Sequence, residues 1–352
     1  YSESDPANPL NVYGQTKLAG DEHIIKHAQK YAIFRLAWVY DDLGINFPKK
    51  ILYAANTACL HYPPHKNLTN LNVDITDSQT VREILHAHHP RAIVHFAAES
   101  HVDRSITCAD QFIKTNINGT YALLVNALNY VENEGGEIGD NFRFLHVSTD
   151  EVFGSLQPHE SGFSETTAYK PNSPYSASKA ASDHLVRCYY ETFGLPTMVT
   201  NCSNNYGPYQ HAEKFIPTVL HSFLKGQKIP VYGDGQQIRD WLFVEDHCDA
   251  LMRVLARGTP GESYNIGGDC EKTNLELIAS IYAELKRVYP GLLKQPLDDY
   301  ISFVEDRFGH DRRYAIDAAK MRSELEWVPA HDFAAGIAKT ISWYQEDLAL
   351  AG

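Results

Sequence analysis

The sequence predicts an α/β fold in which a parallel sheet carries helices on both faces and a smaller α+β part follows. Short apolar runs at 92–97, 142–148 and 197–201 have the length and composition of buried strands. Helical patterns at 110–133 and 176–193 separate these runs. Strands that alternate with helices are typical of βαβ units, and therefore of a parallel sheet.

The smaller part is expected after about residue 205, where the pattern becomes irregular. Glycines interrupt it at Gly233, Gly235, Gly267 and Gly268, which we assign to loops. Two helical patterns, at 274–288 and 333–346, close the chain.

The beginning of the chain resembles a later part of the same chain. Tyr13 and Lys17 open a helical pattern that is followed by a strand-like run at 31–40, and Tyr175 and Lys179 recur at an offset of 162 residues. An offset of this size is too long for a solenoid repeat. We expect the same supersecondary unit to be used twice, with a structural role for Tyr13 and Lys17.

Composition excludes several classes of protein. The 352 residues carry a net charge of −13, which argues against a nucleic-acid-binding surface, and 43% hydrophobic residues argue against disorder. The six cysteines form no C-x-x-C pair, so we predict neither a zinc site nor a disulfide framework. The polar, acidic beginning is no signal peptide and no run of about 18 apolar residues occurs, so we expect a cytoplasmic protein.

Tyr175 and Lys179 are the first candidate catalytic residues. Their spacing of four places both side chains on one face of a helix. A phenol has an ordinary pKa of about 10, and a nearby ammonium favours the phenolate. The pair is therefore a means of making a tyrosine base, although many helices carry Tyr and Lys at this spacing by chance.

Thr149, Asp150 and Glu151 follow the strand at 142–148. In open α/β sheets, ligands bind beyond the carboxyl ends of the strands. Two adjacent carboxyls there could divide into an acid and a base if their environments separate their pKa values. The alternative is a helix N-cap, where these residues are common.

A dinucleotide fold needs a glycine-rich turn between its first strand and first helix, and the sequence offers none in that context. The early candidate turn at 40–44 has one glycine and two carboxylates, which would repel a pyrophosphate. Small residues at 96–100 would admit a flat cofactor, and the run 201–208 is polar directly after a strand. Cations that could offset phosphate charge are Lys214, Arg239, Arg307, Arg312 and Arg313.

From about Tyr53 to Tyr344, the chain resembles the dTDP-glucose 4,6-dehydratases of the extended short-chain dehydrogenase/reductase superfamily. The resemblance implies a Rossmann-like sheet, and it is specific because several long motifs occur in the right order. These stretches are 95–105, 148–152, 174–179, 201–208, 237–241 and 306–314. Phe308 stands where the family usually has proline. The carboxyl pair beside Tyr-x-x-x-Lys favours a dehydratase over a 4-epimerase.

The resemblance implies NAD as cofactor and dTDP-glucose as substrate. Tyr175, assisted by Lys179 and Thr149, would take the sugar 4-hydroxyl proton, Glu151 the C5 proton, and Asp150 would protonate the leaving 6-hydroxyl. The residues implied to contact NAD are Asp74, Ile75, Phe96, Ala97, Ala98, Thr115, Tyr175, Lys179 and Asn205. Those implied to hold the nucleotide sugar are Ser100, Asn204, Lys214, Phe215, Pro230, Tyr232, Arg239, Asn274, Asp306, Arg307 and His310.

Residues 1–52 resemble a different family, the dTDP-4-dehydrorhamnose reductases. We therefore expect a reductase-like fragment at 1–52, a NAD-binding Rossmann-like domain at 53–205 whose first βαβ unit is missing, and a mainly substrate-binding region at 206–352. The strand at 31–40 could occupy the vacant unit. The alternative is a catalytically silent chain that binds dTDP-sugar or dimerises without a working pyrophosphate site. The family pattern implies a homodimer through helices such as 176–193.

Overall fold

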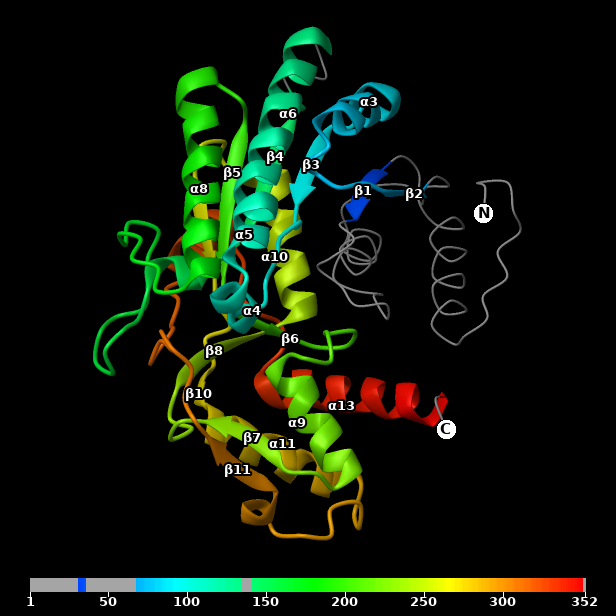
Figure 1. Ribbon diagram of the computed structural model, residues 1–352, viewed down its shortest axis with the longest axis vertical. Helices are drawn as coiled ribbons and strands as arrows, with labels where there is room; N and C mark the ends of the chain where they lie inside the picture. The colour runs from blue at the N-terminus through cyan, green and yellow to red at the C-terminus, as the bar shows by residue number, and fades with distance from the viewer. Residues whose placement is uncertain (1–30, 36–67, 135–140, 351–352) are drawn as a thin grey trace.

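The computed structural model describes residues 31–35, 68–134 and 141–350 (Figure 1). Its main sheet has four parallel strands in the order β3-β4-β5-β9. These strands are β3 (Ala92–His95), β4 (Arg143–Thr149), β5 (Thr197–Cys202) and β9 (Ser263–Ile266). The predicted strands at 92–97, 142–148 and 197–201 are confirmed within one or two residues.

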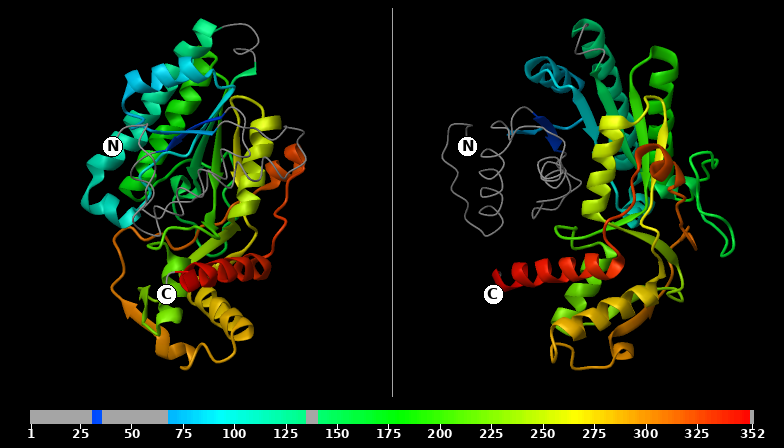
Figure 2. Two further views of the ribbon diagram at one scale, coloured as in Figure 1. Left: turned by 90° about the vertical axis from the view of Figure 1, so that its right-hand side faces the viewer. Right: turned by 180° about the vertical axis from the view of Figure 1, so that it is seen from behind.

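Helices cover both faces of this sheet, as the two views of Figure 2 show. On one face α3 (Ser78–His88), α6 (Thr120–Glu134) and α8 (Pro174–Phe193) pack against alternate strand residues that include Phe144 and Val199. On the other face α10 (Val244–Arg257) and α12 (Ala319–Leu325) pack against Leu145 and Met198. Successive residues of a strand point to opposite faces, so one apolar run serves both cores.

The predicted helix at 110–133 is a continuous stretch that contains both α-helical and π-helical turns. The short α4 (Val102–Thr107) precedes α5 (Ala109–Phe112), which runs into a π-helix, η1 (Ile113–Gly119), and then into α6. Such π segments inside helices are frequent at functional sites. Here the segment brings Asn116 to a buried position beside α8, where its side chain donates to Ser178 Oγ over 2.8 Å.

The helix α8 begins where its local sequence requires. Ser173 is the N-cap, its side chain and that of Ser176 bond each other's backbone N–H, and Pro174 occupies the first turn. Proline fits there because its missing N–H would be unpaired anyway. Gly194 ends the helix in the left-handed region with a φ of 71°. This helix presents Tyr175 and Lys179 to the end of the sheet.

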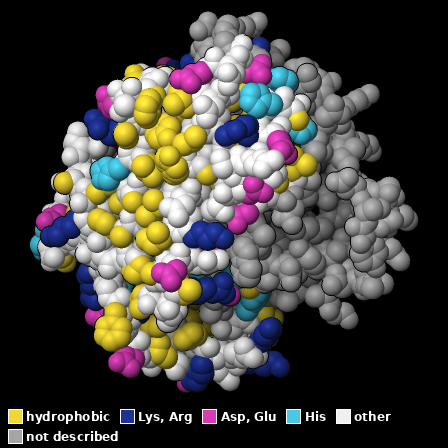
Figure 3. Space-filling view, turned by 45° about the horizontal axis from the view of Figure 1, so that its top comes forward, with side chains coloured by type: hydrophobic (Ala, Val, Ile, Leu, Met, Phe, Trp, Pro, Cys, Tyr) yellow, Lys and Arg dark blue, Asp and Glu magenta, His cyan; other side chains and the backbone are white. Residues whose placement is uncertain are grey.

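Apolar side chains are also exposed on the face that carries α6 and α8, where Figure 3 shows them gathered in a band. Ile106, Ile113 and Tyr121 are 40%, 46% and 52% exposed. Among the residues that the structure describes, no helix has the length and hydropathy needed to cross a membrane.

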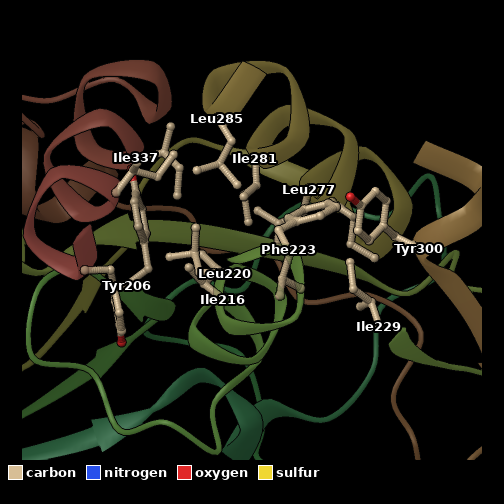
Figure 4. Close-up of a cluster of buried hydrophobic side chains, with 14 of the residues drawn as sticks. Tyr206, Ile216, Leu220, Phe223, Ile229, Leu277, Ile281, Leu285, Tyr300 and Ile337 are labelled. Carbon is tan, nitrogen blue, oxygen red and sulfur yellow. The ribbon is translucent and has the colours of Figure 1, made fainter. Parts of the chain in front are cut away.

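The smaller part packs three helices, α9 (Phe215–Lys225), α11 (Asn274–Val288) and α13 (Phe333–Leu350), around one apolar cluster (Figure 4). Its strands form small sheets in which β8 pairs with β10 and β6, and β7 pairs in parallel with β11. They are β6 (Asn204–Tyr206), β7 (Ile229–Tyr232), β8 (Ile238–Phe243), β10 (Glu271–Thr273) and β11 (Ile301–Val304). Two 3₁₀ turns complete the elements, η2 (Asp150–Phe153) and η3 (Leu297–Tyr300).

The chain crosses between the two parts more than once, since β9, α10 and α12 return to the main sheet from beyond residue 206. The division at residue 205 stays a prediction. The helix predicted at 274–288 is confirmed as α11, and the helix predicted at 333–346 is confirmed as α13 with a longer end.

A separate parallel pair joins β1 (Tyr31–Arg35) to β2 (Leu68–Asn72). The predicted strand at 31–40 is confirmed over its first five residues, whereas β2 was not predicted. The pairing places a strand from the segment predicted to be reductase-like beside a strand from the segment predicted to be the next domain. The predictions on Tyr13, Lys17 and the turn at 40–44 lie outside the described residues.

Candidate active site

A cavity of about 770 Å³ opens at the carboxyl ends of β4 and β5. The start of α8, the residues after β3 and the segment 202–214 complete its wall. All five predicted catalytic residues line it, with six of the predicted binding residues. They are Thr149, Asp150, Glu151, Tyr175 and Lys179, with Phe96, Ala98, Ser100, Asn204, Asn205 and Lys214. This is the sheet edge at which ligands bind in open α/β folds.

The carboxyl pair lies in the first turn of η2, directly after β4. The capping role considered for Asp150 and Glu151 belongs to Thr149, whose Oγ1 accepts from the Glu151 N–H over 3.3 Å. Burial, and then the charge of Glu151, raises the pKa of Asp150 well above its ordinary value. Burial also raises the pKa of Glu151, against the opposing charges of Arg307 and Arg239. The pair can therefore hold a proton at a pH where exposed carboxyls are ionised.

Tyr175 differs from the expectation that its neighbour Lys179 lowers the pKa of the phenol. Burial, and then the charge of Glu151, raises the pKa of Tyr175 well above its ordinary value. A hydrogen bond with the Thr149 side chain is the contact that opposes this shift. The physical reason is that the hydroxyl is withdrawn from water beside a carboxylate, so the phenol is neutral at pH 7.

The Lys179 ammonium is directed into the sheet. Its Nζ donates to Val147 O over 2.9 Å and lies 3.3 Å from His146 Nε2. Burial lowers the pKa of Lys179 to about 8, and the charge of Asp183 opposes that shift. His146 and Asp183 were not predicted as site residues. The signals were present, since Asp183 follows Lys179 by four on one helix face and His146 lies on β4.

Ion pairs between two segments close one side of the cavity. Glu213 pairs with Arg104 and lies 3.4 Å from His101 Nε2, and Lys214 Nζ donates to Ser100 O over 3.1 Å. The segment after β3 is itself fixed by a residue of η1, because Asn116 accepts from the Glu99 N–H over 2.8 Å and donates to Glu99 O over 3.1 Å.

Four of the predicted sugar-nucleotide residues meet around Gln237, outside the lining of the cavity. Gln237 donates to Asp306 over 3.1 Å and accepts from Asn274 over 3.4 Å. Asp306 lies 2.6 Å from His310 Nδ1, and the His310 ring meets the Tyr232 ring edge-on at 6.1 Å. Gln237 was not predicted as a member of the site. It belongs to the motif at 237–241, but a neutral amide at this position does not by itself indicate a binding role.

The remaining predicted sugar-nucleotide residues are spread more widely. Arg239 lies 4.3 Å from the centre of the Tyr314 ring and donates to Asp311 O, and Arg307 lies 3.4 Å from Asp103. Phe215 packs partly buried against the core of the smaller part, and Pro230 is exposed on β7. Phe308 is 86% exposed.

Of the nine residues implied to contact NAD, the structure places five at the cavity and four outside its lining. Phe96, Ala98 and Asn205 line the cavity with Tyr175 and Lys179. Asp74 is exposed and lies 3.9 Å from Lys114, Ala97 and Thr115 are half-buried, and Ile75 is buried against Gly119.

Buried polar atoms at the cavity give a test of fit for a polyhydroxyl ligand. Asp150 Oδ2, Asn204 Oδ1 and Gln210 Oε1 are buried acceptors without a hydrogen-bond partner among the described residues. Buried acceptors are normally paired, so these three suit hydroxyl donors of a sugar or ribose. The residues that are described therefore fit the nicotinamide riboside half of NAD and a sugar beside it.

Two family models match the chain. Residues 36–340 match the model described as GDP-mannose 4,6 dehydratase, and residues 1–60 match the model described as RmlD substrate binding domain. The two matches overlap near the junction expected from the sequence. They agree with the two resemblances found in the motifs.

Relatives named dTDP-glucose 4,6-dehydratase cover most of the chain. The protein of Salmonella typhimurium is 49% identical over 332 residues, which are 92% of this chain and 88% of the relative. The protein of Xanthomonas campestris is 55% identical over 272 residues, 77% of each chain.

Solved structures of the same name share the fold. The dTDP-glucose 4,6-dehydratase of Streptomyces venezuelae, solved with NAD bound, has a TM-score of 0.74 at 36% identity and covers 96% of this chain and 94% of its own. That of Bacillus anthracis, in complex with NAD, has a TM-score of 0.72 at 36% identity and covers 96% and 93%. The Rossmann-like α/β fold is confirmed, and the chain belongs to the NAD-dependent dTDP-glucose 4,6-dehydratase family.

Proposed function

We propose that this chain converts dTDP-glucose to dTDP-4-keto-6-deoxyglucose and water. The observation that carries the proposal is the carboxyl pair of buried Asp150 and half-buried Glu151, on the same cavity as Tyr175. Oxidation of a sugar carbon needs a base such as Tyr175. Elimination of water needs in addition a base at one carbon and an acid at the leaving oxygen, and two carboxyls can divide these roles.

The proposed roles follow from position and charge. Tyr175 takes the proton of the sugar 4-hydroxyl as a phenolate, a form that the positive charge of bound NAD would favour over the neutral phenol of the chain alone, with Thr149 bonded to the phenol. Glu151 takes the C5 proton, because three cations, Arg307, Arg239 and Lys214, favour its carboxylate. Asp150 gives a proton to the 6-hydroxyl as it leaves, because its deep burial holds the carboxyl protonated. Bound NAD would supply the acceptor for the C4 hydride and the donor of a hydride to C6, so the overall reaction is redox-neutral.

The binding roles follow the same division of the site. Tyr175, Lys179, Phe96, Ala98 and Asn205 are the described residues that would hold the nicotinamide riboside. Ser100, Asn204 and Lys214 would hold the sugar, and the residues around Gln237 would hold the nucleotide part. Asp74, Ile75, Ala97 and Thr115 stay predicted contacts of NAD.

The test is incubation of the purified chain with dTDP-glucose and NAD in D₂O, followed by mass spectrometry. The expected product has lost one water and has gained one deuterium at C5. Glu151→Gln should lose both, whereas Asp150→Asn should keep some exchange at C5 and lose most of the elimination. A folded wild-type chain that binds NAD and leaves dTDP-glucose unchanged would contradict the proposal.

A second candidate function is a silent chain that binds dTDP-sugar without turnover. The observation that favours it is the sequence itself, which has no glycine-rich turn after a strand to receive a pyrophosphate. Calorimetric titration with NAD separates the two candidates. Micromolar affinity supports the dehydratase, and no binding at millimolar NAD, with dTDP still bound, supports the silent chain.

We further propose that the chain forms a homodimer through α6 and α8 and works in the cytoplasm. The exposed apolar side chains of Ile113 and Tyr121 support the first proposal, since exposed apolar patches often mark interfaces. The free, exposed thiols of Cys108 and Cys188 support the second, because thiols stay reduced there. Light scattering of the wild type and Tyr121→Glu tests the dimer, which the variant should weaken.

A further inference from the structure

A buried polar network lies behind Lys179, on the side away from the cavity. His146 Nε2 is 3.3 Å from Lys179 Nζ and 3.3 Å from Asp183 Oδ1. His146 is fully buried, and Asp183 and Lys179 are each 3% exposed. The three side chains come from β4 and from two positions of α8 that are one turn apart.

Three donors hold the Asp183 carboxylate by one of its oxygens. Ser148 Oγ and Tyr169 OH donate to Oδ2 over 2.9 Å each, and Asn201 Nδ2 over 3.1 Å. Oδ1 has no hydrogen-bond partner among the described residues and is left facing His146. The carboxylate is therefore fixed in place, and its uncompensated oxygen faces the ring nitrogen of His146 that also lies beside the ammonium.

The charges that face Lys179 explain why this matters. His146 on β4, His95 on β3, Cys202 on β5, and Tyr175 and Asp183 on α8 are the titratable groups around it. Burial and the neighbouring ammonium hold the pKa of both histidines well below the ordinary range, so the rings are neutral. An ammonium withdrawn from water needs a paired charge. Among these groups, Asp183 is the carboxyl: burial raises its pKa, whereas the charge of Lys179 and the three donors favour its ionised form.

We propose that Asp183 is a positioning residue of this active site: it is the buried counter-charge of Lys179 and, with His146, holds the ammonium charged at the end of β4. The catalytic part of the proposal rests on the proposed dehydratase function. The electrostatic part concerns the chain by itself.

Asp183→Asn separates charge from shape. The amide oxygen can still accept from Ser148, Tyr169 and Asn201, because their three bonds converge on one atom. The amide nitrogen replaces Oδ1 and can donate to His146 Nε2. The variant therefore keeps the packing and the bonds, removes the negative charge, and competes with Lys179 for the ring nitrogen.

The first measurement is a titration of Lys179 by NMR in protein labelled at lysine Cε, with Lys179→Met to assign the signal. The wild type should titrate near the pKa of about 8 expected for Lys179. In Asp183→Asn the acid dissociation constant should rise at least about ten-fold. Tyr169→Phe is the matched control, since it removes a donor to the same carboxylate without changing its charge. Equal titration of the wild type and Asp183→Asn would overturn the proposal.

The second measurement is the pH profile of kcat. The basic limb should move to lower pH in Asp183→Asn and stay in place in Tyr169→Phe. A purely structural role would lower the melting temperature of Asp183→Asn and leave the limb where it is, which would contradict the proposal. If the wild type has no turnover, the proposed function fails, and the NMR titration decides this inference alone.

If Asp183→Asn does not fold, the double variant Asp183→Asn/Lys179→Met decides. It folds if an unpaired buried ammonium was the cause, because the double variant removes both charges. If it also stays unfolded, Asp183 has a structural role and the proposal is wrong.

Discussion

Around Tyr175 the side chains of the site are nearly withdrawn from water, whereas around Tyr232 exposed side chains surround a buried amide, Gln237. Tyr175, Asp150 and Lys179 are 9%, 2% and 3% exposed, and Tyr232 and Phe308 are 38% and 86% exposed. The first group comes from β4, η2 and α8. The second group comes from the end of β7, the start of α11 and the loops that hold Gln237 and Asp306, and Gln237 bonds both Asp306 and Asn274.

The difference in exposure suggests a division of roles, with proton transfer in the group around Tyr175 and ligand binding in the group around Tyr232. In the inner group, burial shifts the pKa values of the phenol and both carboxyls upward, so proton transfer is arranged by the main sheet. In the outer group, exposed side chains can adjust to a ligand at little cost. Substitutions in the inner group should therefore change kcat or the pH dependence of stability, and those in the outer group should change KM.

Tyr175→Phe should have the largest effect. It removes the hydroxyl and keeps the ring, which meets Phe112 edge-on at 6.3 Å. We expect kcat to fall by about 10³-fold, the scale of a lost general base. Single-turnover kinetics measure the effect, and an unchanged melting temperature is the control. A drop of less than ten-fold would mean that the inner group does not contain the base.

Gly268→Ala tests the close contact between the segment after β9 and strand β8. A Cβ there would collide with Trp241 O, and the Gly268 N–H donates to Asp240 Oδ2 over 2.8 Å. We expect a loss of about 3 kcal/mol in the free energy of unfolding. Gly226→Ala is the matched control, since nothing lies near its Cβ and only its φ of 63° is unfavourable, at about 1 kcal/mol. Urea denaturation compares them, and equal losses would contradict the collision.

Asp150→Asn should stabilise the protein while it impairs catalysis. The folded state raises the pKa of Asp150, so it holds the proton more tightly than the unfolded chain does. This group therefore contributes stability below its unfolded pKa of about 4 and loses it as pH rises toward the folded pKa. We expect the variant to gain on the order of 1 kcal/mol at neutral pH, and the gain to vanish near about pH 4. Chemical denaturation at the two pH values measures it, and a gain that is equal at both would be the contrary result.

Asp103→Asn should have the smallest effect. It breaks the ion pair with Arg307, which is partly exposed and 3.4 Å long. Exposed pairs contribute roughly 0–1 kcal/mol. We expect an unchanged kcat, a KM for dTDP-glucose raised less than about ten-fold, and no difference from the wild type in high salt. Steady-state kinetics at two ionic strengths test this, and a changed kcat would contradict the assignment of the outer group to binding alone.

The same difference explains how far the sequence could predict the site. Thr149, Asp150 and Glu151 were predicted because they directly follow an apolar strand. Tyr175 and Lys179 were predicted to share a helix face, because four residues make about one helical turn. The direction of the Tyr175 pKa was predicted wrongly, since depth of burial depends on packing between distant segments.

Other features depended on contacts that local patterns do not contain. The polar run of β2 has no strand signature apart from its pairing with β1. The outer group meets at Gln237 from positions separated by tens of residues, so its members were reached through a family resemblance rather than through spacing. His146 reads as one more residue of a buried strand until the position of Asp183 is known.

The bonds made by Asn116 have a consequence for motion. Its side chain is bonded to Glu99 in the segment after β3 and to Ser178 on α8, and its carbonyl accepts from Ser182 over 2.7 Å. A movement of the segment after β3 must therefore carry α8 with it or break these bonds. We expect amide hydrogen exchange at Glu99 to occur with the opening of the whole α8 layer rather than with the fast fluctuations of a loop. A ligand that binds the segment after β3 would in this way slow the opening of α8, which carries Tyr175 and Lys179.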